Sequence, residues 1–206
     1  MSVRAQLIDY GAGNIASAYR ALEAAGWDVQ VATKPEPTDR ADLLVIPGVG
    51  HFGQCATAIA RSGFAEVIND RLHAGKPLLG ICVGLQVLYT KSEEAPGVPG
   101  LGLIPGAVVR IPDDGIRAVP HMGWNTLKVS HPSPVVSGID NEYLYFVHSY
   151  MVVPATDHTL AVTDHEGVTI PAIIQEGPLL ATQFHPEKSG VVGRRFLSDV
   201  KELSWV

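Results

Sequence analysis

The first half of the chain alternates short apolar segments with helical ones, and this alternation restricts the fold more than any other feature. The apolar segments have the length and composition of buried strands and cover residues 5–10, 27–32, 42–46 and 77–81. Helical patterns cover residues 14–25 and 54–74, with a weak point at Ser62-Gly63, and another runs from the last strand to about Thr90. Strands separated by helices need crossover connections, which predict a parallel sheet covered by helices on both faces.

The second half of the chain has a different composition and pattern. Residues 92–106 are rich in proline and glycine, and we expect a surface loop there. Short runs rich in β-branched and aromatic residues follow at 107–111, 124–129, 143–153, 159–163, 169–174 and 179–184, before a last helix over 190–204. These runs predict hairpins and edge strands added to the same core. Since no linker divides the chain, the sequence predicts one α/β domain over residues 1–206, with a mainly parallel, open central sheet, flanking helices and added β hairpins.

Composition excludes several classes of protein. With 46% hydrophobic and 17% charged residues, the 206-residue chain is globular rather than disordered. Its formal net charge of −6 and its lack of a Lys/Arg cluster argue against binding to nucleic acid or to an anionic membrane. No apolar run suits a signal peptide or a membrane span, so we expect a cytoplasmic protein. The two cysteines, Cys55 and Cys82, do not suggest a disulfide scaffold, but they allow for one reactive thiol.

Cys82 stands in the segment 80–84, which reads GICVG and lies between a predicted strand and a predicted helix. This is the cysteine version of the G-x-S-x-G nucleophile elbow, in which flanking glycines remove Cβ clashes from a tight turn. Such a turn lifts the thiol above the sheet edge, favours the thiolate at a helix N-terminus, and turns the N–H of Val83 toward a developing oxyanion. The alternative for this segment alone is a buried cysteine in an ordinary turn, and Cys55, among helical alanines, has only that structural interpretation.

A thiol nucleophile needs a general base, and the base needs a group that orients it. His185, Pro186 and Glu187 follow a predicted strand. In an extended chain, residues two apart project to the same side, and proline restricts the residue before it to the extended region. His185 and Glu187 are therefore predicted to lie together, with one imidazole nitrogen on the carboxylate and the other facing Cys82. In isolation, a solvated His-Pro-Glu at a strand end is the common alternative.

A second turn, residues 47–50 (PGVG), directly follows another predicted strand. Loops after the carboxyl ends of strands line the cleft of open α/β sheets, and G-x-S-x-G enzymes take their second oxyanion donor from such a loop. The N–H groups of Val49 and Gly50 are candidates for that donor. The same residues would also suit a plain turn.

Together, the segments PGVG, GICVGLQ and FHPE resemble the class I, or triad, glutamine amidotransferases. Further segments, DYGAGN (9–14), SEEAPG (92–97), PHMGWN (120–125), YFVHSY (145–150) and FHPEKS (184–189), narrow the resemblance to the glutaminase subunits of imidazole glycerol phosphate synthases, which act in histidine biosynthesis. The resemblance covers nearly the whole chain, and its departures are apolar exchanges at Val83 and Leu85. It implies a flavodoxin-like fold and the hydrolysis of glutamine to glutamate and ammonia, with no cofactor and no metal.

The resemblance also assigns roles to individual residues. It implies a catalytic triad of Cys82, His185 and Glu187, beside an oxyanion hole that includes Gly50 and Val83. It implies that glutamine is held by Gly50, Gln86, Glu94, Ser149 and Tyr150. It places Asn14, Trp124, Tyr145 and Lys188 near a partner subunit. Each also has a plainer interpretation, as a solvated polar residue or, for Trp124, as part of the core.

Nothing in the sequence predicts a use for ammonia within this chain, which has no Walker-type phosphate loop and no second domain. Free ammonia would be protonated in water to unreactive ammonium, so we expect a partner that receives it directly. The resemblance implies that this partner is a cyclase subunit with a (β/α)8 barrel, which forms imidazole glycerol phosphate and an aminoimidazole carboxamide ribotide within a heterodimer. His121 and His148 are interpreted as structural, because no Cys/His spacing suggests a metal site.

Three alternatives stay open at this point. Residues 11–16 (GAGNIA) fit the G-x-G-x-x-A dinucleotide fingerprint, but the next strand ends without the acidic residue that would bind the ribose. A non-catalytic binding module on the same fold would have lost a triad residue, and none is lost. A glutaminase of another synthase, such as one for anthranilate or pyridoxal phosphate, is disfavoured by the segments PHMGWN and HPEKS.

Overall fold

A computed structural model describes residues 3–35, 40–115 and 117–203. Its centre is an eight-stranded sheet with the order β2-β1-β3-β4-β12-β11-β10-β7. The parallel part consists of β2 (Asp28–Ala32), β1 (Arg4–Ile8), β3 (Leu43–Ile46), β4 (Leu78–Ile81) and β12 (Leu179–Thr182). The antiparallel part consists of β11 (Val168–Glu176), β10 (Thr159–His165) and β7 (Lys128–Val129). The predicted α/β fold with a mainly parallel central sheet is confirmed.

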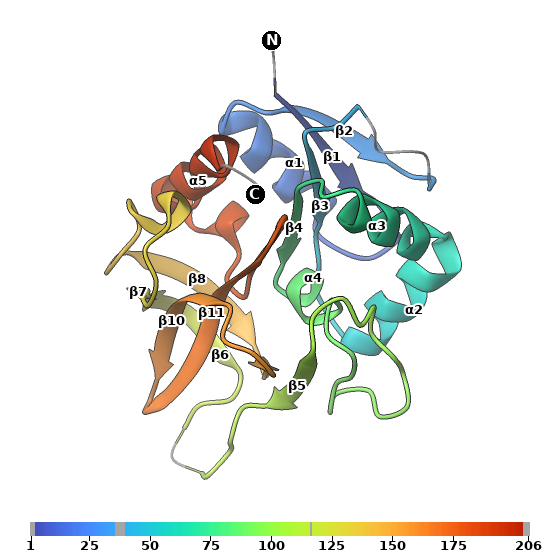
Figure 1. Cartoon of the computed structure of the whole chain (residues 1–206). Helices are drawn as coiled ribbons and strands as arrows, with labels where there is room; N and C mark the ends of the chain where they lie inside the picture. Colours follow the sequence, from blue (N-terminus) through green and yellow to red (C-terminus); the bar gives the residue numbers. More distant parts are fainter. Residues whose placement is uncertain (1–2, 36–39, 116, 204–206) are drawn as a thin grey trace.

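Helices lie on both faces of the parallel part (Figure 1). α1 (Ile15–Ala24) connects β1 to β2, whereas α2 (Phe52–Ser62) and α3 (Phe64–His73) connect β3 to β4. These connections run in opposite directions across the sheet, so right-handed crossovers place α1 on one face and α2 and α3 on the other. α5 (Gly190–Asp199) packs against α1. The strand order reverses between β1 and β3, which is where open α/β sheets form their binding cleft.

Two helix boundaries bear on the predictions. Gly63, with a left-handed φ of 81°, separates α2 from α3 at the predicted weak point. The last helix is shorter than predicted, because α5 ends at Asp199 and a 3-10 turn, Val200–Glu202, follows it. Residue 204, where that helix was predicted to end, lies outside the described residues. No helix within the described ranges is long and apolar enough to cross a membrane.

The helix after Cys82 is a single turn, α4 (Val83–Gln86), so the prediction of a helix reaching about Thr90 is wrong. The reason lies in the segment 92–106, which folds back onto the chain after α4. The N–H groups of Leu101 and Leu103 bind the carbonyls of Val87 and Leu88, respectively, at 2.7 and 2.8 Å. This segment is only partly the surface loop that was predicted, since Ile104 is fully buried.

Two antiparallel pairs flank the main sheet, but they are not the predicted hairpins, because other segments separate their strands along the chain. β5 (Gly106–Arg110) pairs with β9 (Tyr150–Pro154), and β6 (His121–Thr126) pairs with β8 (Tyr143–His148). The run 143–153 was predicted as one segment, but β8 and β9 belong to different sheets and meet at Ser149. A 3-10 turn, η1 (Pro134–Val136), lies between β7 and β8.

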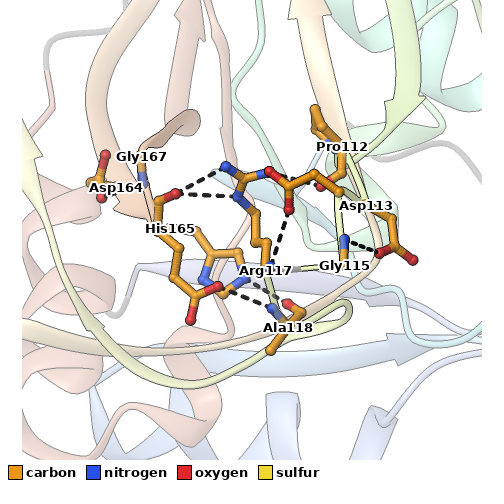
Figure 2. Close-up of polar contacts among 10 residues, drawn as sticks. Pro112, Asp113, Gly115, Arg117, Ala118, Asp164, His165 and Gly167 are labelled. Carbon is orange, nitrogen blue, oxygen red and sulfur yellow. Dashed lines mark hydrogen bonds and ion pairs between the residues drawn. The ribbon is translucent and has the colours of Figure 1, made fainter.

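Arg117 fixes the segment that leads from β5 to β6 (Figure 2). Its guanidinium donates to the backbone carbonyls of Pro112 and Glu166. The carboxylate of Glu166, in the turn between β10 and β11, accepts from the N–H of Ala118 at 3.0 Å. These bonds tie the segment to the main sheet just before Pro120, a residue that lines the cleft described below.

Candidate active site

The loops that follow β3, β4 and β12 meet the β8–β9 junction around a cavity of about 400 Å³. The cavity is lined by Val49, Gly50, Cys82, Val83, Gln86, Pro120, Val147, His148, Ser149, Tyr150, His185 and Lys188. Three segments that the sequence offers separately, the cysteine elbow, the HPE turn and the PGVG loop, therefore contribute to one cleft at the carboxyl ends of the parallel strands.

Cys82 occupies a strained turn between β4 and α4. Its φ of 53° and ψ of −106° lie where an L residue is rarely found. A Cβ on Gly80 would lie 2.8 Å from the carbonyl oxygen of Gly84, and a Cβ on Gly84 would lie 2.1 Å from that of Ile46. Both contacts are with backbone, so the elbow requires both glycines. The N–H of Cys82 donates to the carbonyl of Thr182 at 2.7 Å, which ties the elbow to β12.

His185 and Glu187 lie together, as predicted. Nδ1 of His185 is 2.7 Å from Oε1 of Glu187, and their side chains are only 1% and 4% exposed. The predicted geometry is partly wrong: His185 is extended, with φ −99° and ψ 97°, but Pro186–Lys188 form a 3-10 turn, η2. That turn, rather than a continued strand, returns the carboxylate to the imidazole. The N–H of His185 also donates to the carbonyl of Tyr145 at 2.9 Å, which holds the base to β8.

The two ring nitrogens of His185 have different surroundings. Nδ1 is bonded to Glu187, whereas Nε2 has no hydrogen-bond partner among the described residues and belongs to the cavity that Cys82 also lines. Burial alone would lower the pKa of His185, but the neighbouring Cys82 thiolate and Glu187 carboxylate outweigh it and raise the pKa to about 10. α4 is a single turn, so its dipole at Cys82 is small and the predicted helix contribution at the thiol is weaker than the sequence suggested.

Gln183 is a polar neighbour of the thiol that the sequence analysis missed. It is fully buried, and its Nε2 lies 3.7 Å from Sγ of Cys82. Its Oε1 accepts from Nε2 of Gln86 at 3.2 Å, and the same Nε2 donates to the carbonyl of Tyr150 at 3.0 Å. The only signal in the sequence is a polar residue in an apolar run two positions before His185.

Comparison with known proteins agrees with this geometry. Residues 6–200 match the family described as glutamine amidotransferase class-I. The chain belongs to this family. This amidotransferase is 50% identical over 200 residues to the imidazole glycerol phosphate synthase subunit HisH of a Thermus thermophilus strain, with 96% of each chain covered. It is also 50% identical over 199 residues to the HisH subunit of Deinococcus radiodurans, which covers 95% of this chain and 91% of that one.

Solved structures show the same fold at lower identity. PurLQS from Thermotoga maritima superposes with a TM-score of 0.78 at 22% identity, covering 98% of this amidotransferase and 99% of that chain. A structure titled glutamine amidotransferase gives a TM-score of 0.73 at 20% identity, with coverage of 95% and 98%. The family match decides against the dinucleotide-binding alternative.

Most residues predicted to hold glutamine line the cavity of this amidotransferase. They are Gly50, Gln86, Ser149 and Tyr150. Glu94 does not line it, because its Oε2 accepts from the N–H of Phe52 at 2.6 Å, at the start of α2. Phe52 closely follows the 47–50 loop, so Glu94 fastens the far end of that loop.

Two of the four residues predicted to lie near a partner, Trp124 and Tyr145, are on the β6–β8 pair, and a third, Lys188 in η2, lies over the Tyr145 ring. Trp124 is 55% exposed, so its interpretation as a core residue is wrong. Its ring centroid lies 6.0 Å from that of Tyr145, on the opposite strand, and Nζ of Lys188 lies 5.7 Å from the Tyr145 centroid. Met122, 62% exposed, extends the same face, which we call the Trp124 face. Asn14 instead caps the N-terminus of α1.

His121 and His148 form a buried pair, and His148 itself lines the cavity. Nδ1 of His121 lies 3.0 Å from Nε2 of His148, whose Nδ1 donates to the carbonyl of Tyr150 at 2.8 Å. Burial lowers the pKa of His121 to about 4 and that of His148 to about 3, so both are neutral near pH 7. This arrangement agrees with a structural role. In the described part of the chain, no group of three or more His, Cys, Asp or Glu residues could hold a metal ion.

Proposed function

We propose that this chain is the glutaminase subunit of an imidazole glycerol phosphate synthase and hydrolyses glutamine with a triad of Cys82, His185 and Glu187. The proposal depends on one observation: the elbow thiol of Cys82 and the imidazole of His185 line the same cleft, and Nδ1 of that imidazole is held by the buried carboxylate of Glu187. The full-length similarity to HisH subunits supports the pathway, which is histidine biosynthesis. On this proposal, residues 1–206 form one amidotransferase domain.

The proposed chemistry is covalent acyl transfer. The Cys82 thiolate attacks the δ-carboxamide carbon of glutamine, and the N–H of Val83 together with that of Val49 or Gly50 stabilises the tetrahedral oxyanion. His185 donates its Nε2 proton to the leaving nitrogen, so that ammonia departs and a γ-glutamyl thioester remains on Cys82. His185 then takes a proton from water, whose oxygen attacks the thioester and releases glutamate. Glu187 keeps Nδ1 protonated and stabilises the imidazolium in both steps.

Recognition of glutamine is assigned to the walls of the same cavity. We propose that Gly50, Gln86, Ser149 and Tyr150 hold its amino-acid end, because all of them line the cavity beside Cys82. Glu94 would join them as a carboxylate for the α-ammonium group, but it has to exchange its bond to the N–H of Phe52 for that contact.

The ammonia is proposed to pass to a cyclase partner with a (β/α)8 barrel, in a heterodimer that forms imidazole glycerol phosphate and an aminoimidazole carboxamide ribotide. The Trp124 face supports this assignment, because exposed aromatic side chains beside a catalytic cleft are typical of interfaces. Asn14, Trp124, Tyr145 and Lys188 are the proposed contacts. Two unpaired cysteines agree with a reducing compartment, so we place the heterodimer in the cytoplasm.

The direct test is a Cys82→Ala variant in the assembled enzyme, assayed with either glutamine or ammonium at alkaline pH as the nitrogen source. We expect glutamine-dependent synthesis to disappear, because no thioester can form, while ammonia-dependent synthesis stays near that of the wild type. The ammonium assay is the internal control for folding and assembly. Glutamine hydrolysis near the wild-type rate in Cys82→Ala would disprove the assignment of Cys82 as the nucleophile.

A further inference from the structure

The 47–50 loop is held from behind by two buried side chains that the proposed chemistry does not use. The hydroxyl of Tyr10 donates to the carbonyl of Pro47 at 2.5 Å. The thiol of Cys55, from α2, donates to the carbonyl of Val49 at 3.7 Å. Tyr10 is 6% exposed and Cys55 1%, and neither lines the catalytic cavity.

Both donors are neutral, which suits hydrogen bonding to the two loop carbonyls. Burial raises the pKa of Tyr10 and that of Cys55, and each of the two groups affects the pKa of the other, so they lie side by side. A phenol and a thiol that keep their protons can donate to carbonyls over the whole working range of pH. Cys55, interpreted from the sequence only as a small buried hydrophobe, therefore also has a polar contact.

The front of the loop is fixed by packing. A Cβ on Gly48 would lie 2.3 Å from the backbone nitrogen of Gly84 and 2.8 Å from the carbonyl carbon of Val83, so the loop backbone rests directly on the elbow. Gly50, in contrast, has a φ of 97°, and a Cβ there would meet nothing within 4 Å. The loop is thus clamped at Gly48, while the peptide that follows Val49 can rotate unless its carbonyl is held.

A trans peptide points its C=O and its N–H in opposite directions. The peptide between Val49 and Gly50 turns its carbonyl toward Cys55, on the α2 side, and therefore turns the N–H of Gly50 away from α2. Val49 and Gly50 both line the cavity, whereas Cys55 does not. The bond to Cys55 thus keeps the Val49 carbonyl out of the cleft and leaves the Gly50 N–H on the other side of the peptide.

Resting on the proposed function, we infer that Tyr10 and Cys55 are positioning residues of the oxyanion loop, which hold the Pro47 and Val49 carbonyls on the buried side and so keep the Gly50 N–H available to the oxyanion. Removal of either donor leaves a buried carbonyl without its partner, which favours rotation of the loop peptide. The chemistry then loses oxyanion stabilisation, while the Cys82 thiolate and its imidazolium stay in place.

The test uses the variants Tyr10→Phe and Cys55→Ala in the complex with the synthase partner. We expect kcat for glutamine to fall roughly three- to tenfold in each, as the loss of one neutral hydrogen bond predicts, with KM almost unchanged. Cys55→Ser keeps a donor and should restore kcat. Tyr89→Phe is the matched control, because the Tyr89 hydroxyl is also buried and has no hydrogen-bond partner among the described residues.

Two further measurements separate positioning from a general loss of structure. The rate of alkylation of Cys82 by iodoacetamide should stay at the wild-type value, since that displacement needs a thiolate but no oxyanion hole. The amide resonance of Gly50 should shift in both variants and not in Tyr89→Phe. Wild-type kcat with an unshifted Gly50 resonance would overturn the inference, and so would alkylation that slows in proportion to kcat. A failure of the proposed function looks different, because glutamine hydrolysis would then be independent of Cys82 while the Gly50 resonance still reports on the loop.

Discussion

The Cys82 thiol meets two polar partners with different tasks. Gln183 donates an amide N–H to the sulfur, whereas His185 offers an imidazole whose proton can leave. In the proposed mechanism Glu187 acts through His185, because its Oε1 is bonded to Nδ1. A group that transfers the proton contributes more to a rate than a group that orients it, and this difference can be measured.

We expect His185→Ala to lower the rate of thioester formation more than Glu187→Ala, by a further factor on the order of 10–100. The double variant should be no slower than His185→Ala, because Glu187 has no separate route to the reaction. Single-turnover acylation of Cys82, followed in the complex with its partner, measures all three. Losses that multiply in the double variant would mean that the two residues do not act as a unit.

At the scale of elements, the cleft depends on turns rather than on helices or strands. The elbow needs backbone-to-backbone contact at Gly80 and Gly84, and the 47–50 loop needs it at Gly48. Gly50 differs, because its φ of 97° strains any L residue although space for a side chain is available. A substitution there therefore changes the backbone conformation without a steric clash.

Gly50→Ala should lower kcat for glutamine by at least about tenfold, and by about 10²–10³ if the loop donor is lost completely. Gly75→Ala is the matched control, since Gly75 has a φ of 67°, has nothing within 4 Å of an added Cβ, and follows α3 away from the cleft. Both variants should lose similar stability on thermal unfolding, but only Gly50→Ala should lose activity. Equal activity in the two variants would show that the loop conformation does not matter to catalysis.

The predictability of these elements follows from the range of the interactions that form them. The elbow, the break at Gly63 and the proximity of His185 to Glu187 depend on neighbouring residues, and all were predicted. The end of α4 depends on Leu101 and Leu103 from a distant segment, so a helix reaching about Thr90 was wrongly predicted. The bonds of Glu94 to Phe52 and of Gln183 to Cys82 also join residues far apart in the sequence, and no local pattern could show them.

At the scale of the whole molecule, the antiparallel half places buried histidines next to the active site. His148 is bonded to Tyr150, which lines the cavity, and its pKa is lowered mainly by burial and further by the neighbouring imidazoles of His121, His165 and His185. A histidine whose pKa is lowered in the folded state destabilises the fold at pH values where the same histidine is protonated in the unfolded state. Protonation of these histidines at low pH therefore affects both the stability of the fold and the lining of the cavity.

We expect the free energy of unfolding to decrease as the pH falls from about 6.5 to about 4. Over this range the unfolded chain protonates His121 and His148, while the folded chain keeps them neutral. His185 is protonated in the folded state throughout this range, because its pKa is raised to about 10. It opposes the trend only near pH 6.5, where the unfolded chain is still taking up its proton, and adds no slope below about pH 5.5. Urea unfolding of the wild type and His121→Gln at several pH values measures this dependence. The free energy of unfolding of the variant should depend less steeply on pH, by the equivalent of up to about one proton taken up on unfolding. The same dependence of the unfolding free energy on pH in both proteins would contradict the burial of His121 as a neutral group.

The same half of the molecule presents the Trp124 face beside the cavity, and its position allows partner binding and glutamine binding to be separated. Trp124 is exposed and does not line the cavity, whereas Lys188 lines the cavity and also lies over Tyr145. We expect Trp124→Ala to weaken binding of the proposed cyclase partner by at least about 2 kcal/mol, or roughly 30-fold in Kd, as for a central aromatic residue of an interface. Lys188→Ala should weaken it less, by about 0.5–1 kcal/mol, the size of one exposed charged contact.

Calorimetric titration with the partner gives the two dissociation constants, and KM for glutamine at saturating partner gives the other half of the comparison. Val31→Ala, another exposed apolar residue on the edge strand β2, should change neither quantity. A raised KM with an unchanged Kd in Trp124→Ala would assign the Trp124 face to the substrate instead of the partner. In Lys188→Ala, a change in both quantities would follow from its two contacts, because one ammonium group then serves the cavity wall and the interface at once.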